Sequence, residues 1–136
     1  MKKKTIFAII VILVGAGVAV GLWQYNRPHR QIASEIPSFS LSATELVANF
    51  NHDENGANKL YLDKVLSVSG IILEVLGDEQ PTTLLLGDDT KSAVVSCTLD
   101  STQSISGLTV GKAIKLKGRC TGMLMEVVLV DCFLEK

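Results

Sequence analysis

The spacing of hydrophobic and polar positions changes twice along the chain. Residues 5–23 carry no charge and are almost all apolar, and residues 43–50 place apolar side chains at helical intervals. From Lys64 onward, short segments alternate between apolar and polar side chains, as half-buried strands do. This order predicts a long apolar helix, a short amphipathic helix and then a series of strands.

The first segment has the length and composition of a membrane-spanning helix. Its nineteen residues, at about 1.5 Å each, span roughly 28 Å, close to a hydrocarbon thickness of about 30 Å. Trp23 and Tyr25 follow, and such amphipathic rings settle at the membrane interface. We expect an uncleaved anchor over residues 1–26. A secreted protein remains the alternative, because Gly17 and Ala19 form a poor signal-peptide cleavage site.

The charges beside this helix predict its orientation. Lys2, Lys3 and Lys4 precede it, and Arg27 and Arg30 follow it. The positive-inside tendency places the more basic side in the cytoplasm. The N-terminus is therefore expected inside, and the remaining residues outside, in the periplasm or the extracellular space.

A G-x-x-x-G pair lies within the apolar segment. Gly17 and Gly21 could bring two membrane helices close together. Small residues are also common in membrane helices that do not associate. Dimerisation through the anchor therefore remains an alternative, in which the chain is a structural envelope protein.

A linker and a short helix are expected to follow the anchor. Residues 27–41 carry two prolines among polar side chains and are typical of a linker. Ser42 and Glu45 then fit a capping box, in which the Ser42 hydroxyl accepts a hydrogen bond from the Glu45 amide. The pattern predicts a helix over 43–50, and residues 51–60 form either a turn or a second helical piece.

Five segments after Lys64 have the composition of β-strands separated by turns. The apolar phase of the first segment changes at Gly70, which predicts a β-bulge and a sharp bend there. A bent first strand followed by four more strands predicts a small barrel. The strands are expected at 65–75, 82–86, 92–99, 113–120 and 126–134, with a tight turn at Thr121-Gly122.

The net charge of the strand region limits the classes of ligand that it is expected to bind. The whole chain has a formal charge of −1. The part from Ser34 onward contains 14 carboxylate side chains and 8 Lys and Arg, so its formal charge is −6. An acidic domain disfavours a phosphate backbone as its main partner. Residues 82–99 also contain no aromatic side chain and one base, Lys91, whereas single-strand binders stack bases on aromatic rings. The sequence therefore disfavours nucleic acid.

The sequence contains no pattern typical of catalysis or of a metal site. His52-Asp53-Glu54 could assist acid–base chemistry in a cleft, but solvent exposure is the simpler interpretation of a polar segment. Asp78-Glu79 and Asp88-Asp89 lie in predicted turns and lack the spaced ligands of a calcium loop. We expect no enzyme, no cofactor and no metal.

The order of elements resembles the bacterial OB-fold family named for its similarity to tRNA-anticodon-binding domains. That resemblance implies a membrane or lipid anchor, a short helix and a five-stranded barrel, and its motifs indicate a fold rather than an activity. The expected fold class is thus mainly β, an OB-fold-like barrel over 42–136 preceded by a short helix and a transmembrane helix. The residues that carry the resemblance are Tyr61, Lys64, 65–70, 95–97, 111–118 and 128–132.

The three cysteines, Cys97, Cys120 and Cys132, allow at most one internal disulfide. In an OB barrel the third and fifth strands are parallel neighbours, so Cys97 and Cys132 lie toward the same end. Cys120 closes the fourth strand and is expected to lie several residues away from Cys132. The candidate bridge is therefore Cys97–Cys132, and three reduced, buried thiols are the alternative.

A ligand face follows from the fold. OB barrels commonly bind ligands on the second and third strands and the adjoining loops. The predicted function is a non-catalytic, membrane-anchored binding module of the cell envelope that recognises a protein, peptide or glycan, and nucleic-acid binding is the alternative. Lys115, Lys117 and Arg119 form a basic row on one face of the fourth strand, and this row could equally be a solvated face. The candidate residues are Thr83, Leu85, Lys91, Lys115, Lys117 and Arg119.

Overall fold

The computed structural model describes residues 2–26 and 30–136. They form two compact units that divide between Gln31 and Ile32. Arg27 and the first proline of the expected linker lie outside the described residues, so the structure does not bear on their part in the orientation or the linker.

The first unit is the long apolar helix that the sequence predicts. Helix α1 (Lys2–Tyr25) buries none of its side chains, and it is long and apolar enough to cross a membrane. A signal sequence near the N-terminus would satisfy the same criteria. The space around Gly17 and Gly21 is open, because a Cβ built at either residue meets no atom within 4 Å.

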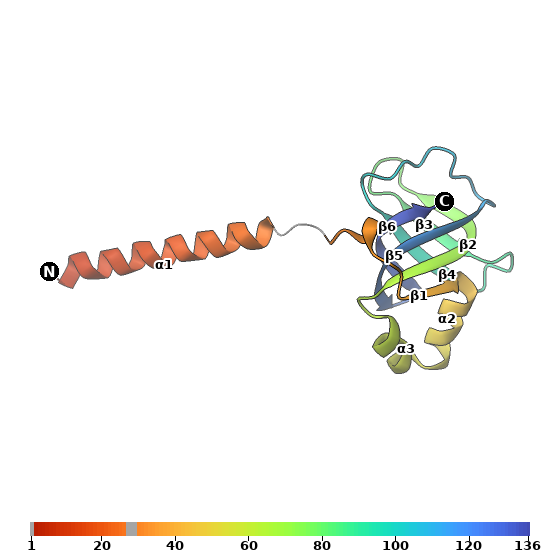
Figure 1. The fold of residues 1–136 in the computed structure, drawn as a ribbon, viewed down its shortest axis with the longest axis horizontal. Coiled ribbons are helices and arrows are strands. Elements are labelled where there is room, and N and C mark those ends of the chain that lie inside the picture. Colours follow the sequence, from red (N-terminus) through yellow and green to blue (C-terminus); the bar gives the residue numbers. More distant parts are fainter. Residues whose placement is uncertain (1, 27–29) are drawn as a thin grey trace. The chain divides into compact units, whose positions relative to one another are not determined.

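The second unit is a closed β-barrel built from five main strands (Figure 1). Strand β2 pairs with both β3 and β5, and β4 runs parallel to β6. The ring therefore closes in the order β2-β3-β4-β6-β5, which confirms the predicted barrel. The strands are β2 (Val65–Leu76), β3 (Thr83–Gly87), β4 (Val94–Leu99), β5 (Ala113–Met123) and β6 (Val127–Glu135).

Part of the expected linker belongs to the barrel unit. A 3-10 turn, η1 (Ile32–Ser34), buries Ile32 completely, and strand β1 (Phe39–Ser42) runs parallel to β2 with Phe39 opposite Leu66. The linker prediction differs here because a four-residue strand is too short to stand out from its polar neighbours. Its pairing with β2, which is distant in sequence, and the packing of Phe39 against Tyr61 stabilise it.

The irregularity in β2 lies later than predicted. Its register with β5 is unbroken through Gly70, and the shift falls between Ile72 and Glu74 in the pairing with β3. Ile72 is buried while Ile71 is partly open, so the apolar phase continues across the glycine. A Cβ at Gly70 would lie 3.3 Å from that of Ala43. The glycine therefore permits close packing rather than a bulge.

The predicted turn at Thr121-Gly122 is also wrong. Strand β5 continues to Met123, which pairs with Val127, and the chain turns at residues 124–126. Gly122 has a φ of +104° beside a register shift between Cys120 and Gly122. The glycine thus accommodates an irregularity within the hairpin, which from sequence alone resembles the hairpin's end.

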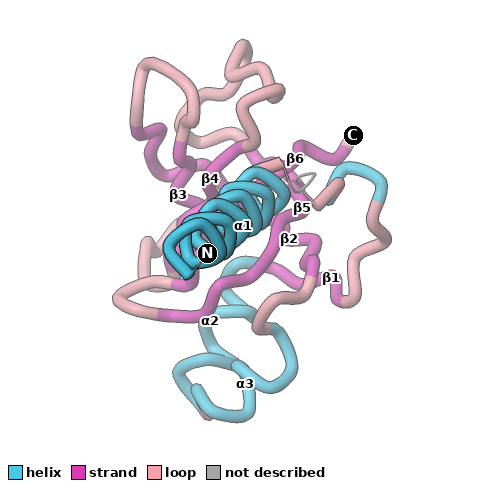
Figure 2. Tube along the Cα trace, turned by 90° about the vertical axis from the view of Figure 1, so that its left-hand side faces the viewer, coloured by secondary structure: helices cyan, strands magenta, loops and turns pink. Residues whose placement is uncertain are grey.

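Two helices follow β1 and lie at one end of the barrel (Figures 1 and 2). They are α2 (Ala43–His52) and α3 (Glu54–Tyr61). The Ser42 hydroxyl accepts the Glu45 backbone N–H at 3.1 Å, as the capping pattern predicts. The Asp53 carboxylate accepts the Gly56 N–H at 3.0 Å and starts the second helix.

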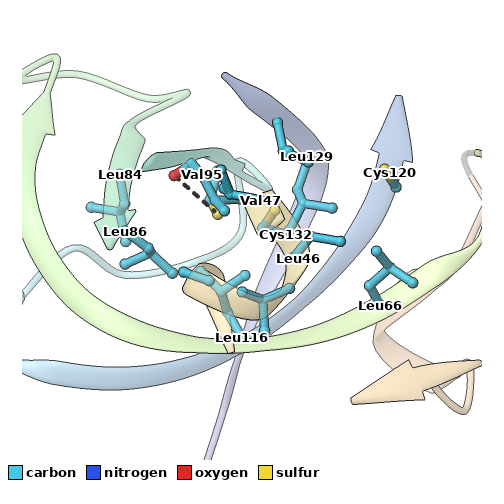
Figure 3. Packing of buried hydrophobic residues seen from close by; sticks show 14 of the residues in the cluster. Leu46, Val47, Leu66, Leu84, Leu86, Val95, Leu116, Cys120, Leu129 and Cys132 are labelled. Atoms are coloured by element: carbon cyan, nitrogen blue, oxygen red, sulfur yellow. Dashed lines mark hydrogen bonds between the residues drawn. The ribbon is translucent and has the colours of Figure 1, made fainter. Parts of the chain in front are cut away.

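Helix α2 supplies the side chains that fill this end of the barrel core. Leu46 and Val47 point toward strand residues that include Leu84, Leu86 and Leu129 (Figure 3). The connections at 77–82 and 100–112 lie at the opposite end of the barrel, where the Gln80 side-chain amide donates to the Gln103 carbonyl. The loop end is therefore the end that the helices leave uncovered.

Candidate functional site

The six expected ligand residues fall into two groups. Thr83 and Leu85 lie half-buried on the outer face of β3, which pairs with the second half of β2. Strand β5, which carries the basic row, pairs with the first half of β2. Lys91 lies exposed in the connection from β3 to β4. The structure therefore does not join these residues into one continuous face.

Two members of the basic row have structural partners. The Lys117 ammonium donates to the carbonyls of Ala33 at 2.6 Å and Glu35 at 3.1 Å, so it holds the η1 segment against β5. The Arg119 guanidinium forms ion pairs with Asp63 at 3.0 Å and Asp131 at 3.6 Å. These contacts make both side chains part of the barrel's outer framework.

Replacing Lys117 by glutamine is expected to lower the free energy of unfolding by about 1 kcal/mol, because a hydrogen bond from a charged donor to exposed or half-buried carbonyls is worth roughly that much. Lys115→Gln, two residues away on the same face, should change stability by less than about 0.5 kcal/mol. Urea unfolding followed by circular dichroism measures both. Equal effects at the two positions would contradict the structural role of Lys117.

The third member, Lys115, lines a pocket at the loop end. The pocket has a volume of about 760 Å³, within the range of about 300–1,000 Å³ typical of ligand sites. We call it the loop-end pocket. Its larger apolar side chains are Leu108, Ile114 and Leu134, and its basic side chains are Lys112, Lys115 and Lys136.

Hydrogen bonds fix the wall of the loop-end pocket. The Asp100 carboxylate accepts both the backbone N–H of Thr102 at 2.9 Å and its hydroxyl at 2.6 Å. The Gln103 side-chain oxygen then accepts the Leu134 N–H at 3.1 Å, which ties the loop to β6. The Lys112 ammonium donates to the Gly107 carbonyl at 3.0 Å. The pocket is thus formed by a braced loop.

The basic side chains of the pocket are not neutralised by acidic partners. Within residues 2–26 and 30–136, Lys112, Lys115 and Lys136 form no ion pair. Glu135 also lines the pocket, and its carboxylate accepts the Ser67 hydroxyl. Against a domain balance of −6 from Ser34 onward, three lysines and one glutamate make this pocket locally positive.

Sequence reasoning found Lys115 but missed the rest of the pocket. Lys112 ends a loop, Ile114 is the second residue of β5, Leu134 lies near the end of β6, and Lys136 follows that strand. The pairing of Lys115 with Glu135 across β5 and β6 brings these segments together. The sequence does show lysines near the ends of predicted strands. Only the register of β5 with β6 shows that these lysines lie around the same pocket.

The three cysteines are free, buried thiols. The predicted parallel pairing of β4 and β6 is confirmed, with Cys97 opposite Leu129 and Leu99 opposite Cys132. Burial raises the pKa of Cys97 well above its usual value, and the neighbouring Cys132 thiol raises it further. Burial also raises the pKa of Cys120. The Cys97–Cys132 disulfide stays a prediction.

The polar clusters found in the sequence lie outside the loop-end pocket. His52 and Asp53 border a smaller hollow of about 210 Å³ between α2 and α3, and Asp53 serves there as a helix cap. The hydroxyl of Thr90 donates to Asp88 at 2.6 Å, and this hydrogen bond lowers the pKa of Asp88. Across the described part of the chain, no three metal-ligating side chains gather.

Comparisons with known proteins identify the family of the chain and structures with a similar fold. Residues 1–134 match the tRNA_anti-like family, and no curated protein matches the chain. The fold is similar to the crystal structure of a Klebsiella pneumoniae subsp. pneumoniae lipoprotein for which nucleic-acid binding has been proposed. The two share 16% identity over 82% of this chain and 100% of that chain, with a TM-score of 0.59.

A weaker likeness is to the Stn1–Ten1 complex of S. pombe. It has 16% identity, covers 53% of this chain and 58% of that chain, and has a TM-score of 0.39. The Klebsiella structure, at its higher TM-score, supports the assignment of an OB-type barrel. Function has to be argued from the residues of this chain.

Proposed function

The chain belongs to the tRNA_anti-like family, and we propose that it is a non-catalytic binding module of the cell envelope whose ligand occupies the loop-end pocket. The observation that carries the proposal is the pocket itself, in which lysines without acidic partners among the described residues surround an apolar floor. A pocket of this size with a few polar groups is the usual form of a ligand site.

The proposed location rests on α1 and on its flanks. A helix of this length and apolarity can serve as a single-pass anchor, with Trp23 and Tyr25 at the interface and Lys2 to Lys4 in the cytoplasm. The barrel would then be extracytoplasmic. The similar Klebsiella protein is a lipoprotein, and a lipid anchor would serve the same purpose of holding an OB barrel at a membrane.

The chemistry of the pocket supports binding rather than catalysis. Burial raises the pKa values of Cys97 and Cys120, which keeps these two thiols protonated, and a protonated thiol is a poor nucleophile. His52 is the last residue of α2 and borders the smaller hollow, and it is not among the described residues that line the loop-end pocket. The lysines of the pocket can attract an anion, and the apolar floor can hold a hydrocarbon group.

Nucleic-acid binding is a second candidate. The similar lipoprotein was proposed to have this function, and lysines suit phosphate groups. The described residues that line the loop-end pocket include no aromatic ring, however, and stacking on aromatic rings supplies much of the affinity for single strands. A small anionic ligand therefore fits the pocket better.

Photo-crosslinking in intact envelopes tests the proposed site. The full chain would carry a photoreactive amino acid at position 104, in the pocket, or at position 59, on the exposed face of α3. We expect an adduct at 104 that is lost when Lys112 and Lys115 are both replaced by glutamate, and none at 59. Equal adducts at both positions would contradict the site, and a crosslinked nucleic acid would establish the second candidate.

A further inference from the structure

We infer that the loop-end pocket accepts an amphiphilic anion, with a phosphate or carboxylate head joined to a short aliphatic body. The inference rests on the proposed function, because it names the ligand class of the same pocket. It goes further in assigning different parts of the ligand to different side chains. The head lies among Lys112, Lys115 and Lys136, and the aliphatic body lies on Leu108, Ile114 and Leu134.

The floor of the pocket is apolar and only partly covered. Leu108, Ile114 and Leu134 pack against the barrel core but are not fully buried. A hydrocarbon group laid on them removes further apolar surface from water, which strengthens binding by up to about fourfold for each buried methylene. A simple inorganic anion would leave this surface unused. The floor therefore selects for an apolar body.

The charges of the rim differ from those elsewhere on the barrel. On the same strand as Lys115, the Lys117 ammonium is bonded to two carbonyls and Arg119 to two carboxylates. Among the described residues, the side chains of Lys115 and Lys136 form no hydrogen bond or ion pair, and Lys112 donates a single hydrogen bond, to the Gly107 carbonyl. Ammonium groups without acidic partners, gathered in one concavity of an acidic domain, attract a compact anionic head.

The lining of the pocket disfavours ligands that bind by stacking on aromatic rings. Nucleobases need stacking surfaces, and the described lining has none. Glu135, although it lines the pocket, is engaged with the Ser67 hydroxyl and leaves the three lysines in excess. The lysine rim suits the phosphate or carboxylate head of such a ligand, and the aliphatic floor suits its hydrocarbon body.

Calorimetric titration of the full chain tests the ligand class. The protein would be embedded in nanodiscs of a zwitterionic phospholipid, with empty nanodiscs as the blank. The probes are hexyl phosphate and hexanoate, and the matched comparators are inorganic phosphate, which lacks the body, and hexanol, which lacks the head. We expect each amphiphilic anion to bind at least about tenfold more tightly than either comparator.

Lysine variants locate the binding. Lys112→Gln and Lys115→Gln should each weaken hexyl phosphate binding by about fivefold, as expected for a partly exposed charge pair. Lys59→Gln, which changes an exposed lysine on α3, should leave it unchanged and so controls for partition into the nanodisc. Equal affinity in all three variants would overturn the inference, as would hexaglutamate binding as tightly as hexyl phosphate.

The lipid composition of the nanodisc shows whether the anion in the pocket is a membrane lipid or a free amphiphile. Nanodiscs that contain an anionic phospholipid should abolish the hexyl phosphate signal if a membrane lipid fills the pocket, and leave it intact if a free amphiphile does. Either result supports the ligand class. Adducts at position 104 that persist without any amphiphile binding would overturn the ligand class and leave the proposed site standing, so the two failures are distinguishable.

Discussion

Replacing Leu46 by alanine is expected to lower the free energy of unfolding by about 2–5 kcal/mol, because it removes buried hydrocarbon and leaves a cavity. Leu46 lies on α2, its side chain is 0% exposed, and it points into the barrel among Leu84, Leu86 and Leu129 (Figure 3). Leu46 is one of four side chains of α2 that belong to the buried core.

The matched control is the same substitution at an exposed leucine. Leu60 lies on α3 with 53% of its surface exposed, so Leu60→Ala should cost less than about 1 kcal/mol. Urea unfolding of the full chain, followed by circular dichroism, measures both variants. The chain's single tryptophan lies in α1, so tryptophan fluorescence would not report on the barrel. Similar losses for the two leucines would show that α2 does not close the core.

The position of α2 also bears on where a ligand can bind. The two helices lie at one end of the barrel, and the 100–112 loop stands at the other end with the end of β6 (Figures 1 and 2). A site at the helical end would compete with the packing of Leu46 and Phe50, which are nearly or fully buried. At the loop end, the apolar side chains that pack against the core, such as Leu108 and Leu134, stay partly exposed, so a ligand can contact them without displacing the core.

The sequence predicted the elements whose signals are local. The cap at Ser42 and the alternation of apolar and polar side chains along the strand predicted at 113–120 are set by neighbouring residues, and the structure has both. Strand β1 was missed because its four residues depend on pairing with β2, more than twenty positions away. Gly70 and Gly122 were misassigned because glycine serves bends, turns and close packing alike.

The candidate site was harder to predict than the fold. Alternation makes Lys115, Lys117 and Arg119 equivalent, since all three face away from the core. They differ only through partners distant in sequence, namely the carbonyls near η1 and the carboxylates of Asp63 and Asp131. A pocket assembled from a loop and two strand ends requires the register of β5 with β6, which a single sequence does not contain.

Gly87→Ala is expected to lower the free energy of unfolding by about 1–3 kcal/mol, as insertion of a methyl group into a packed core does. Gly87 ends β3, and a Cβ there would lie 2.5 Å from the carbonyl oxygen of Ala93 and 2.6 Å from a methyl carbon of Leu73. The oxygen belongs to the backbone, so relief requires a shift of the chain between β3 and β4 and not merely a new side-chain rotamer.

Gly70→Ala separates this clash from the general effect of replacing a glycine. Its Cβ would lie 3.2 Å from the backbone oxygen of Gly87 and 3.3 Å from the nearest side-chain carbons, so its neighbours need to move by only a few tenths of an ångström. Both variants gain about 0.4–1 kcal/mol from the reduced entropy of the unfolded chain, so the difference between them isolates the steric cost. We expect Gly87→Ala to be less stable than Gly70→Ala by at least about 1 kcal/mol in the same urea experiment. Equal stabilities would mean that the chain between β3 and β4 yields freely, because the Ala93 carbonyl would then have moved at no cost.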